Sequence, residues 1–252
     1  MTDNVTATDD DATRVITLRR PDKKNALTQD MYAAISRAID GAQTDSKIRC
    51  LVISGGAGAF TAGNDLDDFL KASGNSTGDR PMNAINFLRS LAHNAKPLVA
   101  AVDGVAVGVG TTMIFHCDYV IASTAASFST PFIHLGLVPE GASSLLVPMA
   151  MGHQRAFAML VMGQKISAED AKQAGFVNAV VAPGHAEDEA RKIARQICAL
   201  PAEAVALSRK LLKTPPEDLM RRIDHESKLF GERMTSQEAV AAFNAFFARK
   251  KA

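Results

Sequence analysis

The sequence predicts an α/β fold that ends in a helical region. Up to about residue 130, short apolar runs that suit buried strands alternate with segments whose apolar residues recur at helical spacing. Such alternation is typical of parallel sheets whose strands are connected by helices. Beyond Met149 the periodicity is almost entirely helical, and the length of 252 residues suits one large domain, or one domain with an appendage.

The composition is that of an ordinary globular protein. Apolar residues make up 47% and charged residues 22% of the chain, and the formal net charge is +1, which gives no field to attract nucleic acid or an anionic membrane surface. The chain has no Trp and only two Tyr, which further weakens a nucleic-acid-binding interpretation based on base stacking. We therefore expect neither nucleic acid nor a membrane as partner.

The cysteines and the N-terminus predict the compartment. Cys50, Cys117 and Cys198 are odd in number, form no Cys-x-x-Cys motif and have apolar neighbours, as reduced core thiols do. Residues 1–11 are polar and acidic rather than signal-peptide-like, and no apolar run approaches membrane-spanning length. We expect a cytoplasmic protein whose first eleven residues are disordered.

Apolar runs predict four buried strands in the first half of the chain, at residues 13–18, 50–53, 97–102 and 119–122. Helices are expected to begin near residues 29, 65, 81 and 111. Thr28 is the predicted N-cap of the first helix, which Gly41 ends, and Asn64 or Asp65 is the predicted cap of the second. Residues 74–79 form a polar, glycine-containing loop that we expect to be mobile.

The second half predicts one more strand, at residues 177–181, and a series of helices. These helices cover residues 142–151, 153–162, 168–174, 185–198, 202–212, 217–230 and 236–248. Capping boxes open two of them, at residues 167–170 and 235–238. The last helix carries an apolar stripe of Val240, Phe243 and Phe247. A solitary helical hairpin cannot bury so much apolar surface, so we expect this region to pack on the core or on another subunit.

The sequence lacks the motifs of several common reaction classes. The chain contains neither Gly-x-Ser-x-Gly nor Gly-x-x-x-x-Gly-Lys-Ser/Thr, which argues against an α/β-hydrolase serine and a phosphate loop. The six histidines show no metal-ligand spacing, so no metal site is predicted. Gly108 and Gly110 follow a strand-like segment, but Met113 stands where the third glycine of a dinucleotide fingerprint belongs.

The stretch from Ser129 to Ser144 holds one carboxylate, Glu140, between a proline and a glycine. The residues before it are nearly all apolar. Packing of that segment would desolvate the carboxylate, which disfavours its charged form and makes it a better proton acceptor. The alternative is structural, because an acidic residue near the start of the helix expected at 142–151 complements the helix dipole without any chemistry.

A second segment, from Phe60 to Leu66, joins a glycine-containing loop to a helix. The small side chains of Ala62 and Gly63 are expected to leave backbone N–H groups uncovered just before the helix. Such groups bind an anion or a developing oxyanion. An ordinary capped loop explains the same residues equally well.

Three motifs together resemble the crotonase superfamily of enoyl-CoA hydratases and isomerases. They are Phe60-Thr-Ala-Gly-Asn-Asp-Leu66, Asp103-Gly-Val-Ala-Val-Gly-Val-Gly110 and Thr130-Pro-Phe-Ile-His-Leu-Gly-Leu-Val-Pro-Glu-Gly141. The similarity runs from about Thr13 to the C-terminus. It implies a spiral of ββα units over residues 1–195, a helical trimerisation region over 196–252, and a homotrimer or hexamer. It also implies an acyl-CoA thioester substrate, with coenzyme A as part of the substrate and no further cofactor.

The resemblance also implies site residues. An oxyanion hole falls on the backbone N–H groups of Ala62 and Val109, although the second position is more often glycine in the hydratases. The two glutamates that hold water in the hydratases correspond here to Thr112 and Phe132, and neither can act as a base. The motifs are instead similar to those of the 3,2-enoyl-CoA isomerases of the peroxisomal type, whose base maps onto Glu140. The C-terminus lacks a Ser-Lys-Leu signal, so the peroxisomal compartment is not implied.

One base is enough for such an isomerase. Moving a double bond from C3 to C2 of an acyl thioester removes a proton at C2 and returns it at C4, through a dienolate whose charge lies on the thioester oxygen. One carboxylate can carry the proton while two N–H donors stabilise the oxygen. The residues expected to hold the substrate are Lys24, Ala26, Ala62, Gly63, Asn64, Asp65, Leu66, Phe132 and Leu135, with Phe69 as a further acyl-pocket candidate.

Alternatives remain at this point. Lys23 and Lys24 either approach the coenzyme A phosphates or form a solvated surface pair, and the apolar pocket candidates could be plain core. The chain could handle another enolate of an acyl-CoA, in a hydratase-like or decarboxylase-like reaction. It could also be a non-catalytic acyl-CoA-binding member, because the glutamate pair of the hydratases is missing.

Overall fold

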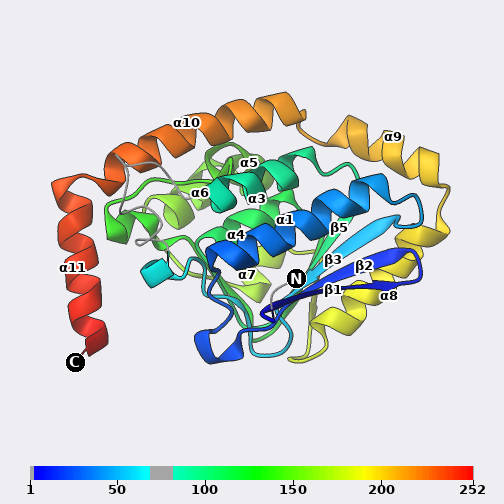
Figure 1. Cartoon of the computed structure of the whole chain (residues 1–252), viewed down its shortest axis with the longest axis horizontal. Helices are drawn as coiled ribbons and strands as arrows, with labels where there is room; N and C mark the ends of the chain where they lie inside the picture. Colours follow the sequence, from blue (N-terminus) through cyan, green and yellow to red (C-terminus); the bar gives the residue numbers. More distant parts are fainter. Residues whose placement is uncertain (1–2, 69–81, 252) are drawn as a thin grey trace.

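A six-stranded sheet forms the centre of the molecule and confirms the α/β class (Figure 1). The computed structural model describes residues 3–68 and 82–251. The strand order is β1-β2-β3-β5-β7-β10, and all neighbours are parallel except the antiparallel pair β1 and β2. The strands are β1 (Val5–Asp10), β2 (Thr13–Leu18), β3 (Cys50–Ser54), β5 (Leu98–Val102), β7 (Tyr119–Ser123) and β10 (Ala179–Val181). The five predicted strands are therefore all present, with their ends shifted by no more than two residues.

Alternate residues of these strands face two different layers. One set, including Val15, Val52 and Val99, packs against small residues of α8 (Ala186–Ala199). The other set faces the main core, which includes residues of α1 (Gln29–Thr44) and α3 (Met82–His93). Because both faces of the sheet are covered, its parallel strands read in the sequence as continuous apolar runs.

The N-terminal segment is ordered, so the prediction of disorder over residues 1–11 is wrong for residues 5–10. These residues form β1, which pairs with β2 from Val5–Leu18 to Asp10–Thr13. Val5 is buried in the main core, and Arg14 binds the carboxylate of Asp9 at 2.7 Å. The polar composition was misleading because an edge strand exposes one face to solvent while its backbone hydrogen bonds hold it to the sheet.

The strands of a second sheet are too short for the apolar patterns to have predicted them. Its order is β4-β6-β8-β9, and its strands are β4 (Ala59–Thr61), β6 (Val105–Val107), β8 (Ser127–Ser129) and β9 (Ile166–Ser167). Each of the first three follows a long strand of the central sheet after a short turn, and α4 (Val109–Thr112) comes directly after β6. These repeats are the ββα units that the resemblance implied.

The remaining helices are near their expected places. They are α5 (Ser143–Met151), α6 (His153–Leu160), α7 (Ala168–Gln173), α9 (Ala202–Leu212), α10 (Pro216–Met234) and α11 (Gln237–Lys251), with 3-10 turns at Pro21–Lys23, Met113–His116 and Pro131–Leu135. Thr28 caps α1 as predicted, but α1 continues through Gly41 to Thr44. The cap before α11 is Ser236, whose hydroxyl accepts the Ala239 N–H at 3.2 Å, rather than Thr235. The expected loop at 74–79 and the acyl-pocket candidate Phe69 lie outside the described residues.

The C-terminal helices cover the core as an arc that runs from α9 through α10 to α11 (Figure 1). Helix α10 buries Leu219, Ile223 and Phe230 against the rest of the chain. Helix α11 contributes Ala239 and Phe243 to a small cluster with Phe132 and Leu137. This region therefore packs on the core, as one of the two expectations had it. Helix α9 buries none of its side chains, and the expected homotrimer or hexamer stays a prediction.

The cysteines are free, and two of them are chemically quiet. Burial raises the pKa of Cys50 and of Cys117 to about 12, so both are thiols rather than thiolates at neutral pH. Within residues 3–68 and 82–251, none of the helices combines the length and the apolar character that crossing a bilayer requires.

The N-terminal strand gives a direct stability test. Val5→Ala should lower the free energy of unfolding by about 1–3 kcal/mol, because it removes a buried side chain from the main core. Thr8→Ala on the solvent side of the same strand should change it by less than about 0.5 kcal/mol. Urea unfolding followed by circular dichroism measures both values. Equal, negligible effects would show that residues 5–10 are not part of the folded sheet.

Candidate active site

A cavity of about 430 Å³ lies where the second sheet meets the C-terminal helices. It brings together all the residues predicted to hold the substrate: Lys24, Ala26, Ala62, Gly63, Asn64, Asp65, Leu66, Phe132 and Leu135. Val109 lines it as well. Three aromatic rings complete the wall, from Phe230 of α10 and from Phe243 and Phe246 of α11. Sequence analysis did not assign these rings to the site, since nothing local links them to the motifs.

The loop at one side of the cavity is held by a buried amide. Asn25 has a left-handed backbone, with φ of 55°, and so does Lys24, with φ of 49°. The Asn25 side chain accepts the Arg20 N–H at 2.7 Å and donates to the carbonyls of Gly55 and Ala59 at 2.8 Å each. A buried amide that uses both its donor and its acceptor groups fixes the loop to the start of β4. Sequence analysis missed Asn25, although asparagine is one of the few residues that tolerate a left-handed conformation.

The expectation that the backbone N–H groups of Ala62 and Gly63 are free to bind a ligand is wrong. The Ala62 N–H donates to the Lys24 carbonyl at 2.8 Å, and the Gly63 N–H donates to Thr61 Oγ1 at 3.0 Å. A parallel bridge joins Leu27 to Asn64, in which Leu27 donates to the Gly63 carbonyl at 2.7 Å and accepts from Asp65 at 2.9 Å.

Asn64 is therefore the better donor of this segment. In a parallel bridge, the residue between the two bonded neighbours directs its own N–H away from the paired strand. Among the described residues, none accepts the Asn64 N–H. Its side chain is fixed separately, since Asn64 Oδ1 accepts the Tyr32 hydroxyl at 2.5 Å. The geometry thus favours Asn64 over Ala62 as the first N–H donor of the expected oxyanion hole.

The second donor, Val109, is brought close by backbone contact. A Cβ placed on Gly63 would lie 2.6 Å from the Val107 carbonyl oxygen, and one on Gly110 would lie 2.5 Å from Thr61 Cγ2. Only glycine allows the two segments to approach so closely. Val109 is the first residue of α4, so its N–H has no acceptor within the helix. The donors of Asn64 and Val109 therefore belong to two segments in direct contact.

Glu140 is buried, with 1% of its surface exposed, which confirms the expected desolvation. The Thr112 hydroxyl donates to its Oε1 at 2.7 Å. Thr112 lies one helical turn beyond Val109 in α4, so the carboxylate lies next to the helix that carries the second donor. Glu140 is not among the residues that line the 430 Å³ cavity, and its link to the cavity is α4, which carries both Thr112 and the lining residue Val109.

Two buried ionisable groups hold the backbone after Glu140, and sequence analysis identified neither. His116 Nε2 donates to the Gly141 carbonyl at 2.7 Å, and burial lowers the His116 pKa to about 4, so the ring is neutral at physiological pH. Glu226 of α10 accepts the N–H groups of Ala142 at 2.6 Å and Ser144 at 2.9 Å. Burial raises the pKa of Glu226, and the charge of Glu140 raises it further, against the lowering by Ser144.

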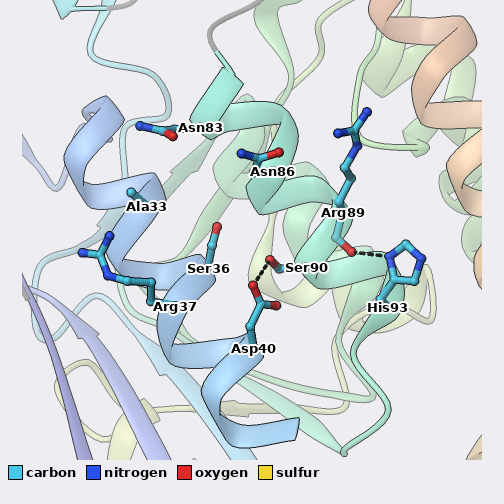
Figure 2. Close-up of a pocket in the computed structure, with 9 residues that line it drawn as sticks. All are labelled: Ala33, Ser36, Arg37, Asp40, Asn83, Asn86, Arg89, Ser90 and His93. Carbon is cyan, nitrogen blue, oxygen red and sulfur yellow. Dashed lines mark hydrogen bonds between the residues drawn. The ribbon is translucent and has the colours of Figure 1, made fainter. Parts of the chain in front are cut away.

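A second cavity, of about 460 Å³, lies between α1 and α3 and contains none of the predicted site residues (Figure 2). Its polar groups bond within the helix pair: Ser90 donates to Asp40 at 3.1 Å, and His93 Nδ1 lies 2.9 Å from the Arg89 carbonyl. The side chains of Arg37 and Arg89 point away from each other (Figure 2). In the part of the chain that the structure describes, no three His, Cys, Asp or Glu residues gather as a metal site would need. We assign the site to the 430 Å³ cavity because the residues predicted to hold the substrate all line it.

Comparisons with known proteins agree on one family. The chain matches the family described as "Enoyl-CoA hydratase/isomerase" over residues 9–252. It is 35% identical over 239 residues to enoyl-CoA delta isomerase 2 of Rattus norvegicus, covering 93% of this chain but only 61% of that protein. It is 31% identical to 1,2-epoxyphenylacetyl-CoA isomerase of Escherichia coli, covering 91% of both. The solved structure of Pseudomonas aeruginosa OdaA matches with a TM-score of 0.91 and 39% identity, over 97% and 99% of the two chains.

His116 predicts a pH dependence of stability. Unfolded His116 binds a proton near its ordinary pKa of 6.5, whereas the folded ring stays neutral down to about 4. The free energy of unfolding should therefore decrease as the pH falls from 6.5 towards 4, by up to about 3 kcal/mol. His116→Gln should lose this slope, while His93→Gln at the exposed end of α3 should keep it.

Urea unfolding between pH 4.5 and 7.5 measures these slopes. Glu226, whose pKa is raised, contributes the opposite slope above pH 4.5, but it does so in every variant and cancels in the comparison. If the free energy of unfolding varied with pH in the same way in the parent protein and in His116→Gln, the neutral, buried state of the His116 ring would be contradicted.

Proposed function

Because the chain belongs to the enoyl-CoA hydratase/isomerase family, which is the crotonase superfamily, we propose that it is an isomerase that moves a double bond from C3 to C2 of an enoyl-CoA. The observation that carries the proposal is the buried carboxylate of Glu140, set beside the helix that begins with Val109. Thr112 and Phe132, in the positions of the two hydratase glutamates, offer no alternative base. The isomerase relatives support the same choice.

In the proposed reaction, the thioester oxygen binds between the backbone N–H groups of Asn64 and Val109. Charge develops on this oxygen when the C2 proton leaves, and donors fixed in a water-poor site stabilise it strongly. The donors need no rearrangement, since each is held by its own backbone: Asn64 by the bridge to Leu27, and Val109 by the start of α4.

Glu140 takes the proton from C2, and the electrons of the C2–H bond move towards the thioester oxygen, which gives a dienolate that keeps the C3–C4 double bond. It then returns the proton to C4, which leaves the double bond between C2 and C3. The Thr112 hydroxyl, at 2.7 Å from Oε1, orients the carboxylate for both steps. Since Glu140 does not line the 430 Å³ cavity, the proposal requires side chains of the cavity wall to move when the acyl chain enters.

The rest of the cavity suits a coenzyme A ester. Its volume falls within the usual range for small-molecule sites. Lys23 and Lys24 lie at one side, where they can approach the phosphates, while the rings of Phe132, Phe230 and Phe243 form an apolar wall for the chain. We propose the same homotrimer or hexamer as above, and the exposed leucines of α9 are available for such contacts.

Glu140→Gln tests the base. The variant should lose isomerisation of 3-hexenoyl-CoA by about 10²–10⁴-fold and keep its affinity for CoA esters, because the amide preserves shape but accepts no proton. Asp40→Asn in the second cavity is the matched control and should retain full activity. The formation of 2-enoyl absorbance measures the rate. Activity of Glu140→Gln within tenfold of the parent protein would rule out its role.

The same assay separates the alternatives. Water addition to 2-hexenoyl-CoA that exceeds isomerisation would identify a hydratase. Turnover of 1,2-epoxyphenylacetyl-CoA above both would identify the activity named for the Escherichia coli relative, which this chain matches over 91% of both lengths. Binding of every ester without turnover would identify a non-catalytic member.

Amide-to-ester replacement tests the assignment of the first donor. Replacing the Asn64 N–H by an ester oxygen, through incorporation of the hydroxy acid, should lower the isomerisation rate by about 10²–10³-fold. The same replacement at Ala62 removes only the hydrogen bond to Lys24, at a cost of about 1 kcal/mol of stability. A large loss of rate with the Ala62 ester and none with the Asn64 ester would instead identify the Ala62 N–H as the first oxyanion donor.

A further inference from the structure

A carboxylate on α10 holds the turn that follows Glu140. Glu226 is 4% exposed and lies more than 80 residues further along the chain. It accepts the Ala142 N–H at 2.6 Å through Oε2, and the Ser144 N–H at 2.9 Å and the Ser144 hydroxyl at 2.5 Å through Oε1. Both of its oxygens are thus committed to the first residues of α5 and the residue before them.

This turn cannot supply those acceptors itself. Gly141 and Ala142 both have left-handed backbones, with φ of 72° and 59°, and Ala142 sits at the N-cap of α5 without a side chain that could cap it. The first N–H groups of a helix have no acceptor within the helix. Glu226 supplies this acceptor from a distant helix, so α10 stabilises a backbone conformation that is otherwise unfavourable for alanine.

We propose that Glu226 is a positioning residue for Glu140, holding residues 141–144 so that the Glu140 carboxylate stays against the Thr112 hydroxyl and beside the N–H donors. The inference rests on the proposed function of Glu140. Glu226 acts through two peptide units and does not touch the substrate. His116 holds the same turn from the other side, at the Gly141 carbonyl.

The two acceptor oxygens of Glu226 are part of this role. Three donors reach them, the Ala142 N–H at Oε2 and the Ser144 N–H and hydroxyl at Oε1. Glutamine has the same size, but its NH₂ group would face a backbone donor. Glu226→Gln therefore keeps the packing of the side chain but removes one of the two acceptors for the backbone N–H groups of Ala142 and Ser144. This makes it the most informative variant.

Steady-state kinetics of four variants tests the proposal. Glu226→Gln should lower kcat for 3-hexenoyl-CoA by roughly 10–100-fold and leave KM within about threefold, because a small displacement of the base affects the chemical step more than binding. Ser144→Ala should lower kcat by a smaller factor. Ser143→Ala is its matched control, since the Ser143 hydroxyl is buried without a partner among the described residues. Asp224→Asn removes an exposed charge from α10 and should change neither constant.

A second readout does not depend on which product is formed. In D₂O, Glu140 would remove a C2 proton of saturated hexanoyl-CoA and return a deuteron, and NMR follows this exchange. Parent protein that exchanges C2 protons but fails to isomerise 3-hexenoyl-CoA would refute the isomerase and leave Glu226 to be judged by the exchange rate. Slower exchange in both Glu226→Gln and Ser144→Ala, with unchanged affinity for hexanoyl-CoA, supports the proposal. If Glu226→Gln does not fold, the exchange rate of Ser144→Ala alone decides between the outcomes. Unchanged exchange, a parallel loss of affinity, or no exchange in the parent protein would overturn it.

Discussion

Direct contact between two backbone segments, residues 61–64 and 107–110, is the constraint on which the site depends. The segments approach so closely that a Cβ on Gly63 or Gly110 would overlap its neighbour. They belong to β4 and β6 and the residues that follow them, and these strands pair in parallel in the second sheet. Because the ββα units stack side by side, equivalent strand ends come together, and the segments that carry Asn64 and Val109 are in contact although the chain separates these residues by 45 positions.

The other parts of the site are positioned by elements that adjoin these two segments. The Asn25 amide fixes the loop that forms one wall, and α4 carries Thr112, which orients Glu140. The opposite wall comes from α10 and α11, which supply aromatic rings to the cavity. In the proposed site, polar groups held by the sheets are therefore available for chemistry, and side chains of the terminal helices provide enclosure.

Sequence patterns could predict only part of this arrangement. The strands of the central sheet were predictable because both of their faces are buried, which leaves runs such as Leu98–Val102 apolar throughout. The second sheet was not, since strands of three residues carry no periodicity. The resemblance named residues that the structure brings together around the cavity, but it gave Ala62 as the first N–H donor, and only the observed hydrogen bonds favour Asn64 instead. Asn25, His116 and Glu226 were missed because their partners are distant in the chain, and local patterns do not record such contacts.

One feature of α10 links the enclosure of the cavity to the base. Glu226 and Phe230 are four residues apart, so they project from the same side of one rigid helix, the first towards the turn after Glu140 and the second into the cavity wall. A ligand that displaces Phe230 would therefore also displace Glu226, and with it the residues after Glu140 to which Glu226 is hydrogen-bonded. With Glu140 as the proposed proton carrier, filling of the cavity and alignment of Glu140 would be coupled through α10, and natural variation along α10 would be expected to change both properties together.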